Sequence, residues 1–292
     1  MRSGKPADSG SATRPWATRR LASCCWRSHW WASWSCAGVP NNKPVVSVRD
    51  SVLRRWYRGP TYPAWLLAAL VVWFACWSWK PAHPQDFLLE HILTVAFLAL
   101  LIATRRRFPL SHLSYTSIFL FISLHIVGAY YTYSLVPYDQ WAETVASWFG
   151  VKNFSLNQAF GFERNHFDRL VHLAFGVLLV YPAREFFLRI AAVKGFWGYY
   201  LPLDVVMSFS LLYELLEWGV AMVFAGDVGQ SYLGTQGDEW DAHKDMALAA
   251  LGALLTMTVV ALINARWQRD FAREFNESLR VKVPLPLADG SL

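Results

Sequence analysis

The sequence predicts an all-α, polytopic integral membrane protein with about six transmembrane helices and both termini in the cytoplasm. Its composition is the first reason. The 292 residues are 54% hydrophobic and only 16% charged, whereas soluble domains carry about 25% charged residues. The chain also contains 16 tryptophans, a residue type that collects at membrane interfaces.

Six long apolar runs are the second reason. Most of them approach the roughly 20 residues that a helix needs to cross about 30 Å of hydrocarbon. They are too long and continuous for the strands of a membrane barrel. The first and fourth runs are the shortest. The predicted helices cover Pro63–Trp79, Phe87–Ala103, Leu113–Leu135, Phe167–Tyr181, Tyr199–Phe224 and Met246–Ile263.

The positions of Lys and Arg set the predicted orientation, because cytoplasmic loops are enriched in these residues. Fourteen lie before the first helix, after the second, after the fourth and in the tail, against five in the alternate loops. We therefore expect both termini in the cytoplasm. A short amphipathic helix, DQWAETVASWFG, is expected on the outer interface between the third and fourth spans.

The net charge of +6 does not indicate a nucleic-acid partner. Residues 1–60 carry 11 Lys and Arg against two Asp, whereas the rest carries 16 Lys and Arg against 19 Asp and Glu. The basic character thus belongs to a leader. We predict a leader at 1–50 that is disordered or results from a start codon placed too early, a six-helix membrane domain at 51–265, and a cytoplasmic tail at 266–292. The start of the tail is expected to extend the last helix, and its last ten residues to be disordered.

Ionisable residues within hydrocarbon mark functional sites. Asp168 and His172 are spaced to share one face of the fourth helix, and Glu214 and Glu217 are neighbours on the fifth. His125 is expected near the middle of the third. Nearly all such residues fall in the outer half of the membrane, so we predict one polar pocket open to the outside. The remaining residues predicted to bind there are Arg164, Asn165, His166, Arg169, Asp238, Asp241 and Asp245.

Whether this pocket is catalytic stays open. In an enzyme, Asp168 and His172 would form a base and its orienting partner, and Glu214 and Glu217 would supply a general acid. Arginine side chains beside them would hold an anionic group such as a phosphate.

A structural interpretation competes with each role. Asp168 can form an ion pair with a neighbouring arginine, and the two glutamates can join helices by pairing with histidines. Glu90 and His91 are expected to snorkel to the interface, and Tyr130, Tyr131 and Tyr133 to form an aromatic belt.

Potential metal ligands are present, but no compact motif such as HExxH holds them together. We therefore expect no metal and no cofactor. P-loop, GxSxG and dinucleotide-binding fingerprints do not occur either.

Three motifs in this order, ERNHFDRLVHLAFG, YELLEW and GTQGDEWDAHKDMALAALGA, resemble the YjdF-like family of bacterial inner-membrane proteins, a domain of unknown function. The position of His243 is often Gln in that family, which argues against a ligand role for it. A more distant likeness is to VanZ-like proteins, associated with glycopeptide-antibiotic tolerance. It rests on Asp168 with His172, on Glu214, and on Asp241 or Asp245 before Gly252. It implies no reaction.

The resemblance implies a multi-pass protein of the bacterial inner membrane. The function we expect is to bind or modify an envelope or lipid-linked molecule at the outer pocket, among membrane lipids. A proton-coupled small-molecule transporter, with Glu214 and His125 as a relay, and a structural or assembly protein are the alternatives.

Overall fold

The computed structural model describes residues 61–223 and 234–282. The chain separates into two units, Met1–Ser47 and Val48–Leu292, and every described residue belongs to the second. The predicted leader, Phe224 at the predicted end of the fifth span, and the final segment VPLPLADGSL lie outside the described residues. Predictions about them stay predictions.

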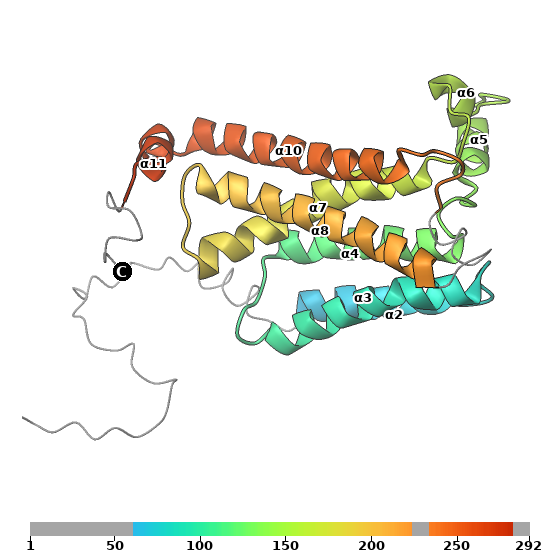
Figure 1. Cartoon of the computed structure of the whole chain (residues 1–292), viewed down its shortest axis with the longest axis horizontal. Helices are drawn as coiled ribbons and strands as arrows, with labels where there is room; N and C mark the ends of the chain where they lie inside the picture. Colours follow the sequence, from blue (N-terminus) through green and yellow to red (C-terminus); the bar gives the residue numbers. More distant parts are fainter. Residues whose placement is uncertain (1–60, 224–233, 283–292) are drawn as a thin grey trace, which may run out of the picture. The chain divides into compact units, whose positions relative to one another are not determined.

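The described residues form α-helices and no strands (Figure 1), which confirms the all-α class. Five helices are long and apolar enough to cross a membrane, namely α3 (Pro84–Thr104), α4 (His112–Tyr130), α7 (Phe167–Ile190), α8 (Trp197–Val223) and α10 (Asp241–Trp267). The apolar helix α2 (Thr61–Trp77) is shorter. The remaining helices are α5 (Tyr138–Trp148), α6 (Leu156–Phe160) and α11 (Phe271–Ser278). A sixth crossing and the orientation of the termini stay predictions.

The third span is shorter than predicted. It was expected to reach Leu135, but α4 ends at Tyr130. The next turn contains Thr132 and Tyr133 with left-handed φ angles of 49° and 54°, which a helix cannot accommodate. His125 therefore lies about 8 Å from the helix end at 1.5 Å per residue, and its depth in the membrane stays a prediction.

The fourth span is longer than predicted. It was expected to stop at Tyr181, yet α7 continues through Pro182 to Ile190, as membrane helices tolerate proline. The tail differs as well. The last long helix ends at Trp267, Gln268 is extended, and α11 begins separately at Phe271. The prediction that the tail continues that helix was therefore wrong, whereas the predicted helix between the third and fourth spans is present as α5.

Helix α7 lies at the centre of the unit, because it contacts α4, α8 and α10. On the far side of α4 lie α2 and α3. The site elements are brought together at one end, where α3, α7 and α10 begin and α4 and α8 end. We call this the polar end. At the other end the carboxylate of Glu185 accepts hydrogen bonds from Ser111 N (2.9 Å) and Ser114 Oγ (2.6 Å), so it caps the start of α4.

Small residues bring α7 and α10 into the most extensive contact among the described helices. A Cβ added to Gly176 of α7 would lie 2.7 Å from the backbone N of Ala253, and would also overlap the carbonyl of Ala249. A Cβ added to Gly252 of α10 would lie 2.9 Å from the backbone N of Val177. The two backbones can approach so closely only because both positions are glycine.

The helices present apolar side chains outward and bury polar ones. On α10, Leu254, Val259 and Leu262 are 50%, 54% and 65% exposed, whereas Asp241 and Asp245 are 4% and 2% exposed. A soluble protein would show the reverse pattern. An apolar outer surface of this kind requires lipid around it.

The glycine contact generates a stability prediction. Gly176→Ala should lower the unfolding temperature in detergent by roughly 3–10 °C, since overpacking a closed contact costs about 1–3 kcal/mol. The control is Gly219→Ala, because a Cβ there has nothing within 4 Å. Equal Tm values for the two variants would contradict a closed contact between α7 and α10.

Candidate functional site

Asn165 ties the loop before α10 to the start of α7. Its side-chain Oδ1 accepts a hydrogen bond from the backbone N of Phe167 (2.9 Å), and its Nδ2 donates to the carbonyl of Val136 (2.8 Å). The side-chain amide of Gln236 bonds both backbone groups of Asn165, at 3.0 and 3.1 Å. Gln236 and Gly237 have φ angles of 50° and 84°, so the loop turns sharply here. Asn165, predicted as a binding residue, is engaged in shaping the site.

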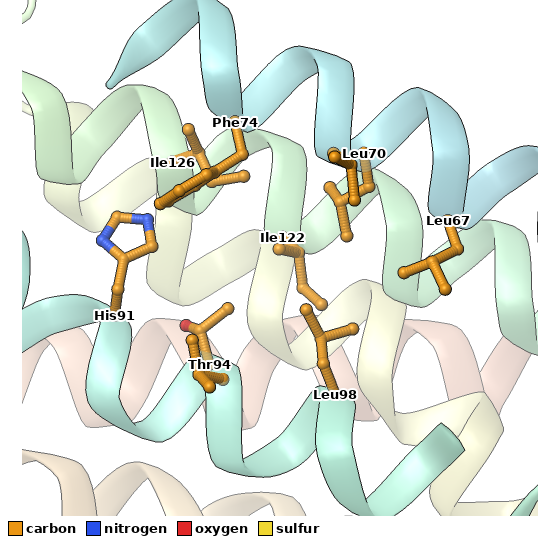
Figure 2. A pocket seen from close by; sticks show the side chains of 10 residues that line it. Leu67, Leu70, Phe74, His91, Thr94, Leu98, Ile122 and Ile126 are labelled. Carbon is orange, nitrogen blue, oxygen red and sulfur yellow. The ribbon is translucent and has the colours of Figure 1, made fainter. Parts of the chain in front are cut away.

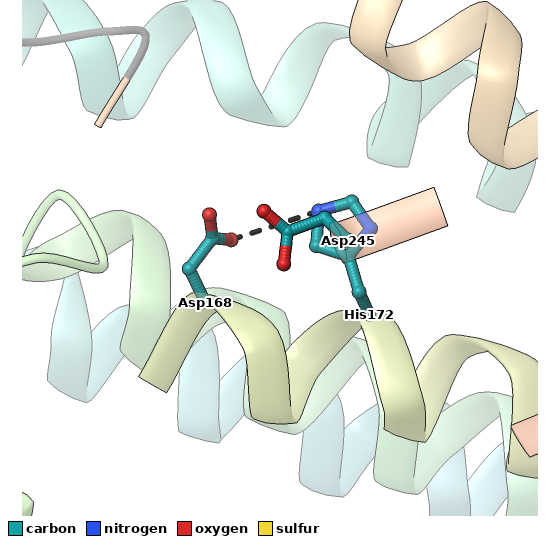
Figure 3. A group of neighbouring side chains, drawn as sticks. All are labelled: Asp168, His172 and Asp245. Atoms are coloured by element: carbon teal, nitrogen blue, oxygen red, sulfur yellow. Dashed lines mark ion pairs between the residues drawn. The ribbon is translucent and has the colours of Figure 1, made fainter. Parts of the chain in front are cut away.

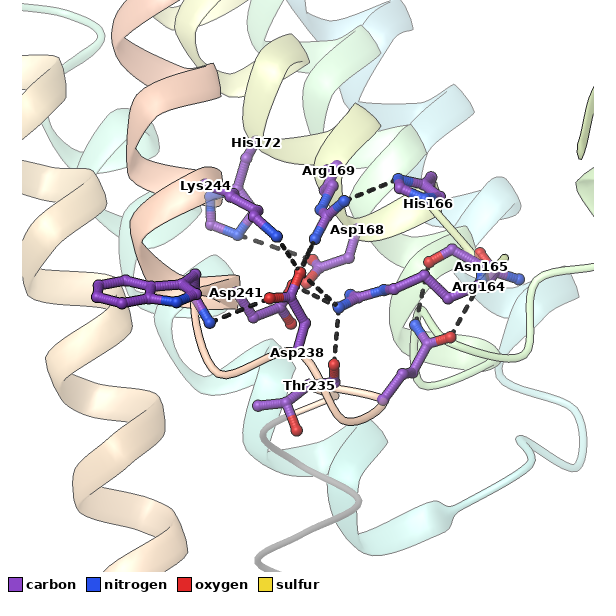
Figure 4. A network of polar contacts seen from close by, with 12 residues as sticks. Arg164, Asn165, His166, Asp168, Arg169, His172, Thr235, Asp238, Asp241 and Lys244 are labelled. Carbon is purple, nitrogen blue, oxygen red and sulfur yellow. Dashed lines mark hydrogen bonds and ion pairs between the residues drawn. The ribbon is translucent and has the colours of Figure 1, made fainter. Parts of the chain in front are cut away.

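Three cations and two carboxylates meet above the first turns of α7 and α10, and we call this group the ion-pair layer (Figure 4). Arg164 Nη1 lies 2.7 Å from Asp241 Oδ1, and Lys244 Nζ lies 2.6 Å from Asp238 Oδ2. Arg169 contacts Asp238 directly and Asp241 at 3.4 Å. With all five groups charged, the layer carries a net charge of +1.

Several donors of the ion-pair layer have no hydrogen-bond partner among the residues that the structure describes. These are the Nε and Nη2 atoms of Arg164 and the Nε atom of Arg169, all of them buried. A buried N–H group is costly when unsatisfied. An anionic group that reached these donors would satisfy them.

His166 lies beside this layer. Its Nδ1 accepts a hydrogen bond from Arg169 Nη1 at 3.2 Å, and its ring stacks on Phe162 with 4.0 Å between centroids. Burial, followed by the charges of Arg169 and Arg164, lowers the pKa of His166. The ring is thus held neutral and does not add to the positive charge of the layer.

Beneath the ion-pair layer, Asp168, His172, Glu214 and Asp245 form what we call the acid–histidine cluster. His172 Nε2 lies 3.7 Å from Asp168 Oδ1 and 3.5 Å from Glu214 Oε1. One ligand atom each from Asp168, His172 and Asp245 lie within 4.8 Å of one another (Figure 3). Helices α7, α8 and α10 therefore contribute to a single group. Glu217 is half-buried and lies within electrostatic range of it.

Glu90 and Tyr133 also belong to the site, although sequence reasoning missed them. Glu90 and His91 are each 6% exposed and Tyr133 is 9% exposed. The predictions that Glu90 and His91 snorkel to the interface and that Tyr133 joins an aromatic belt were therefore wrong. The turn after α4 returns the Tyr133 hydroxyl to within 2.6 Å of His125 Nδ1 and 3.5 Å of Glu90 Oε2.

Tyr213 connects this second group to the acid–histidine cluster. Its hydroxyl donates to Glu90 Oε2 at 2.6 Å, and its ring lies 6.1 Å from that of His172. The signal that could have identified Tyr213 is its position directly before Glu214. Thr94 Oγ1 lies 2.9 Å from His125 Nε2, so both ring nitrogens of His125 have hydroxyl partners.

A cavity of about 150 Å³ lies elsewhere, between α2, α3 and α4 (Figure 2). Its lining is mainly apolar, with Leu70, Phe74 and Ile122 among its walls and His91 at one end. None of the predicted site residues lines it. Thr94, which contacts His125, is also in its lining, so the cavity adjoins the group around Glu90 and Tyr133. The polar pocket open to the outside stays a prediction.

Comparison with known proteins identifies the family. Residues 62–266 match the family described as "Predicted membrane protein (DUF2238)". The chain belongs to this family. It is also 36% identical over 192 residues to the inner membrane protein YjdF of Escherichia coli (strain K12), an alignment that covers 65% of this chain and 85% of that protein. No solved structure matches.

These matches confirm the YjdF-like resemblance and a multi-pass location in the inner membrane. The likeness to VanZ-like proteins is not among them. The chain is thus an integral membrane protein of a family without an assigned function, and the roles of the site residues stay predictions.

The ion-pair layer generates a pH prediction. The hydrogen bond from Lys244, then that from the backbone of Trp240, holds the pKa of Asp238 well below its usual range. Asp238 therefore stabilises the fold above the unfolded pKa of about 4, and this contribution declines as pH falls toward the folded pKa. Asp238→Asn should lower Tm at pH 7, and its difference from the wild type should shrink below about pH 4.

The control for this measurement is Glu239→Gln, at the exposed neighbouring acid. Its Tm should follow that of the wild type across the same pH range. A difference between wild type and Asp238→Asn that does not change with pH would argue against a stabilising carboxylate at this position.

Proposed function

We propose that the polar end binds an anionic, lipid-linked envelope molecule and that the acid–histidine cluster modifies it. The observation that carries the proposal is the position of the ion-pair layer over the acid–histidine cluster. A net positive layer with unpartnered guanidinium donors on Arg164 and Arg169 stands directly above buried carboxylates and a histidine.

Recognition of an anion follows from the arginines. Arg164 and Arg169 are positioned by Asp241 and Asp238, and yet retain free N–H groups. A planar guanidinium fork suits phosphate and carboxylate groups. A headgroup at this position would be oriented by the layer while the rest of the molecule extends from it.

The lipid-linked part is supported by the surface of α8. Leu211, Leu215 and Trp218 are 46%, 50% and 59% exposed on the helix that also carries Glu214. An acyl or isoprenyl chain can therefore remain against apolar surface while its headgroup reaches the site. We predict from the Lys and Arg distribution that this end faces outside.

The cluster offers acid and base groups for chemistry on such a headgroup. His172 lies between Asp168 and Glu214, at 3.7 and 3.5 Å. In the proposed arrangement Asp168 and His172 orient the reacting group, and Glu214 accepts a proton from an attacking hydroxyl or water and returns it to the leaving oxygen. The bond to the attacking oxygen forms as the bond to the leaving oxygen breaks, so the number of protons on the cluster is unchanged at the end.

Proton-coupled transport fits less well. The acids and His125 gather at the polar end, but the core farther along α7, α8 and α10 is apolar. Val180, Val206, Ala253 and Met257 are all at most 4% exposed and pack together there. Within the described residues, a proton relay would have to cross this apolar cluster.

Lipid retention tests the binding step. Native mass spectrometry of the purified full chain should detect a retained anionic lipid or lipid-linked phosphate in the wild type. Arg169→Gln should reduce its occupancy about tenfold, because a hydrogen bond to a charged group contributes roughly 1.5–3 kcal/mol. The matched control is Arg189→Gln, which removes an ion-paired arginine from the opposite end of the same helix.

Retention that is equal in both variants, or no anionic molecule in the wild type, would contradict the proposal. Arg164→Lys provides a second variant that keeps the charge beside Asp241 but removes the planar fork. Its occupancy should fall between those of the wild type and Arg169→Gln.

A further pair of variants separates function from structural support. Asp168→Asn and Glu214→Gln should leave Tm within about 2 °C of the wild type, since neutral isosteres remove charge repulsion among buried acids at little packing cost. Lipid retention should persist. A large loss of Tm in both variants would favour the structural or assembly role instead.

A further inference from the structure

We infer that Asp168, His172 and Asp245 bind a divalent transition-metal ion such as Zn²⁺. This inference goes beyond the proposed function, since it stands on the ligand set alone and needs no lipid. The sequence carries no compact metal motif, and the three residues become neighbours only through the pairing of α7 with α10.

The spacing of the ligand atoms is the first observation. One atom from each of the three side chains lies within 4.8 Å of the others, and His172 Nε2 is 3.7 Å from Asp168 Oδ1. Ligands at about 2.0–2.2 Å from a tetrahedral ion are roughly 3.4 Å apart. The 3.7 Å between His172 Nε2 and Asp168 Oδ1 is too long for a hydrogen bond and close to the separation of two ligands in a coordination shell.

An unpartnered buried carboxylate is the second observation, and it is independent of the spacing. Asp245 is 2% exposed, and its Oδ1 has no hydrogen-bond partner within residues 61–223 and 234–282. Figure 3 shows its carboxylate beside the ring of His172 and facing that of Asp168. Glu214 Oε1, which is 3.5 Å from His172 Nε2, is also buried without a hydrogen-bond partner in the same ranges. Buried carboxylate oxygens normally have partners, and an ion among these atoms would serve all of them.

The charge balance is the third observation. The nearest cations, Arg164 and Arg169, already pair with Asp238 and Asp241. Asp168 and Glu214 have no such partner among the described side chains, as their ion-pair contact is with His172. A divalent cation would offset two of these negative charges.

The ligand types select the class of metal. A histidine nitrogen with two carboxylates suits Zn²⁺, Mn²⁺ or Fe²⁺, whereas Mg²⁺ and Ca²⁺ favour oxygen ligands alone. The helical frame also fits. His172 is one turn before Gly176 on α7 and Asp245 two turns before Gly252 on α10, so the close backbone contact of these two helices holds the ligands at a fixed separation. Glu214 would stand beside the ion, where it can accept a proton from a bound water.

Metal titration tests the inference. The full chain is purified in detergent, stripped with a chelator and titrated with ZnCl₂ by calorimetry and by thermal unfolding. The wild type should bind one Zn²⁺ per chain and gain several degrees in Tm. His172→Gln and Asp245→Asn should each weaken binding at least tenfold, and Asp204→Asn, an exposed acid on α8, should match the wild type.

Two outcomes would overturn the inference, namely no saturable Zn²⁺ binding by the wild type or binding unchanged in both ligand variants. If either variant fails to fold, the Co²⁺ spectrum of the wild type decides, because a low-coordinate site absorbs in the visible more strongly than aqueous Co²⁺. Lipid retention measured on the same stripped sample keeps the proposals apart, since loss of lipid binding alone leaves the metal site intact.

Discussion

The close approach of α7 and α10 determines most of the geometry at the polar end. Gly176 and Gly252 let the two backbones touch, and each lies one or two turns from the site residues of its own helix. Asp168 and His172 therefore meet Asp245 without a long or flexible side chain between them. Larger residues at the two glycines would push α7 and α10 apart. Asp245 would then be separated from Asp168 and His172.

The same contact also sorts the charges into two levels. Arg164 and Arg169 meet the loop acids Asp238 and Asp241, and these pairs form the upper level. Among the described residues, the acids one turn below make no ion pair with an arginine. A net positive layer thus lies over a cluster of buried acids, an arrangement that a random scatter of buried acids would not produce. Burial of so much negative charge is tolerated only where protons or cations are available.

Local spacing predicted much of the site and tertiary contact decided the rest. Composition and apolar runs were sufficient for the all-α membrane class, and the shared face of Asp168 and His172 follows from helical periodicity. The meeting of His172 with Asp245 depends on which helices pair, and no local spacing encodes that choice. The role of Tyr133 depends on a left-handed turn that a run of apolar residues conceals. The predicted helix ends were wrong for a related reason. Hydropathy does not reveal a turn such as the one after Tyr130. It also does not show whether a proline ends a helix or is tolerated within it, as Pro182 is.

The apolar cluster of Val180, Val206, Ala253 and Met257 has a consequence for energy coupling. If the predicted polar pocket ends at this cluster, it would exchange matter with one side of the membrane only. Most of the transmembrane voltage would then fall across the apolar part and little of it across the pocket. Ions and protons that entered and left from the same side would do no electrical work, so chemistry there would draw its driving force from the reactants.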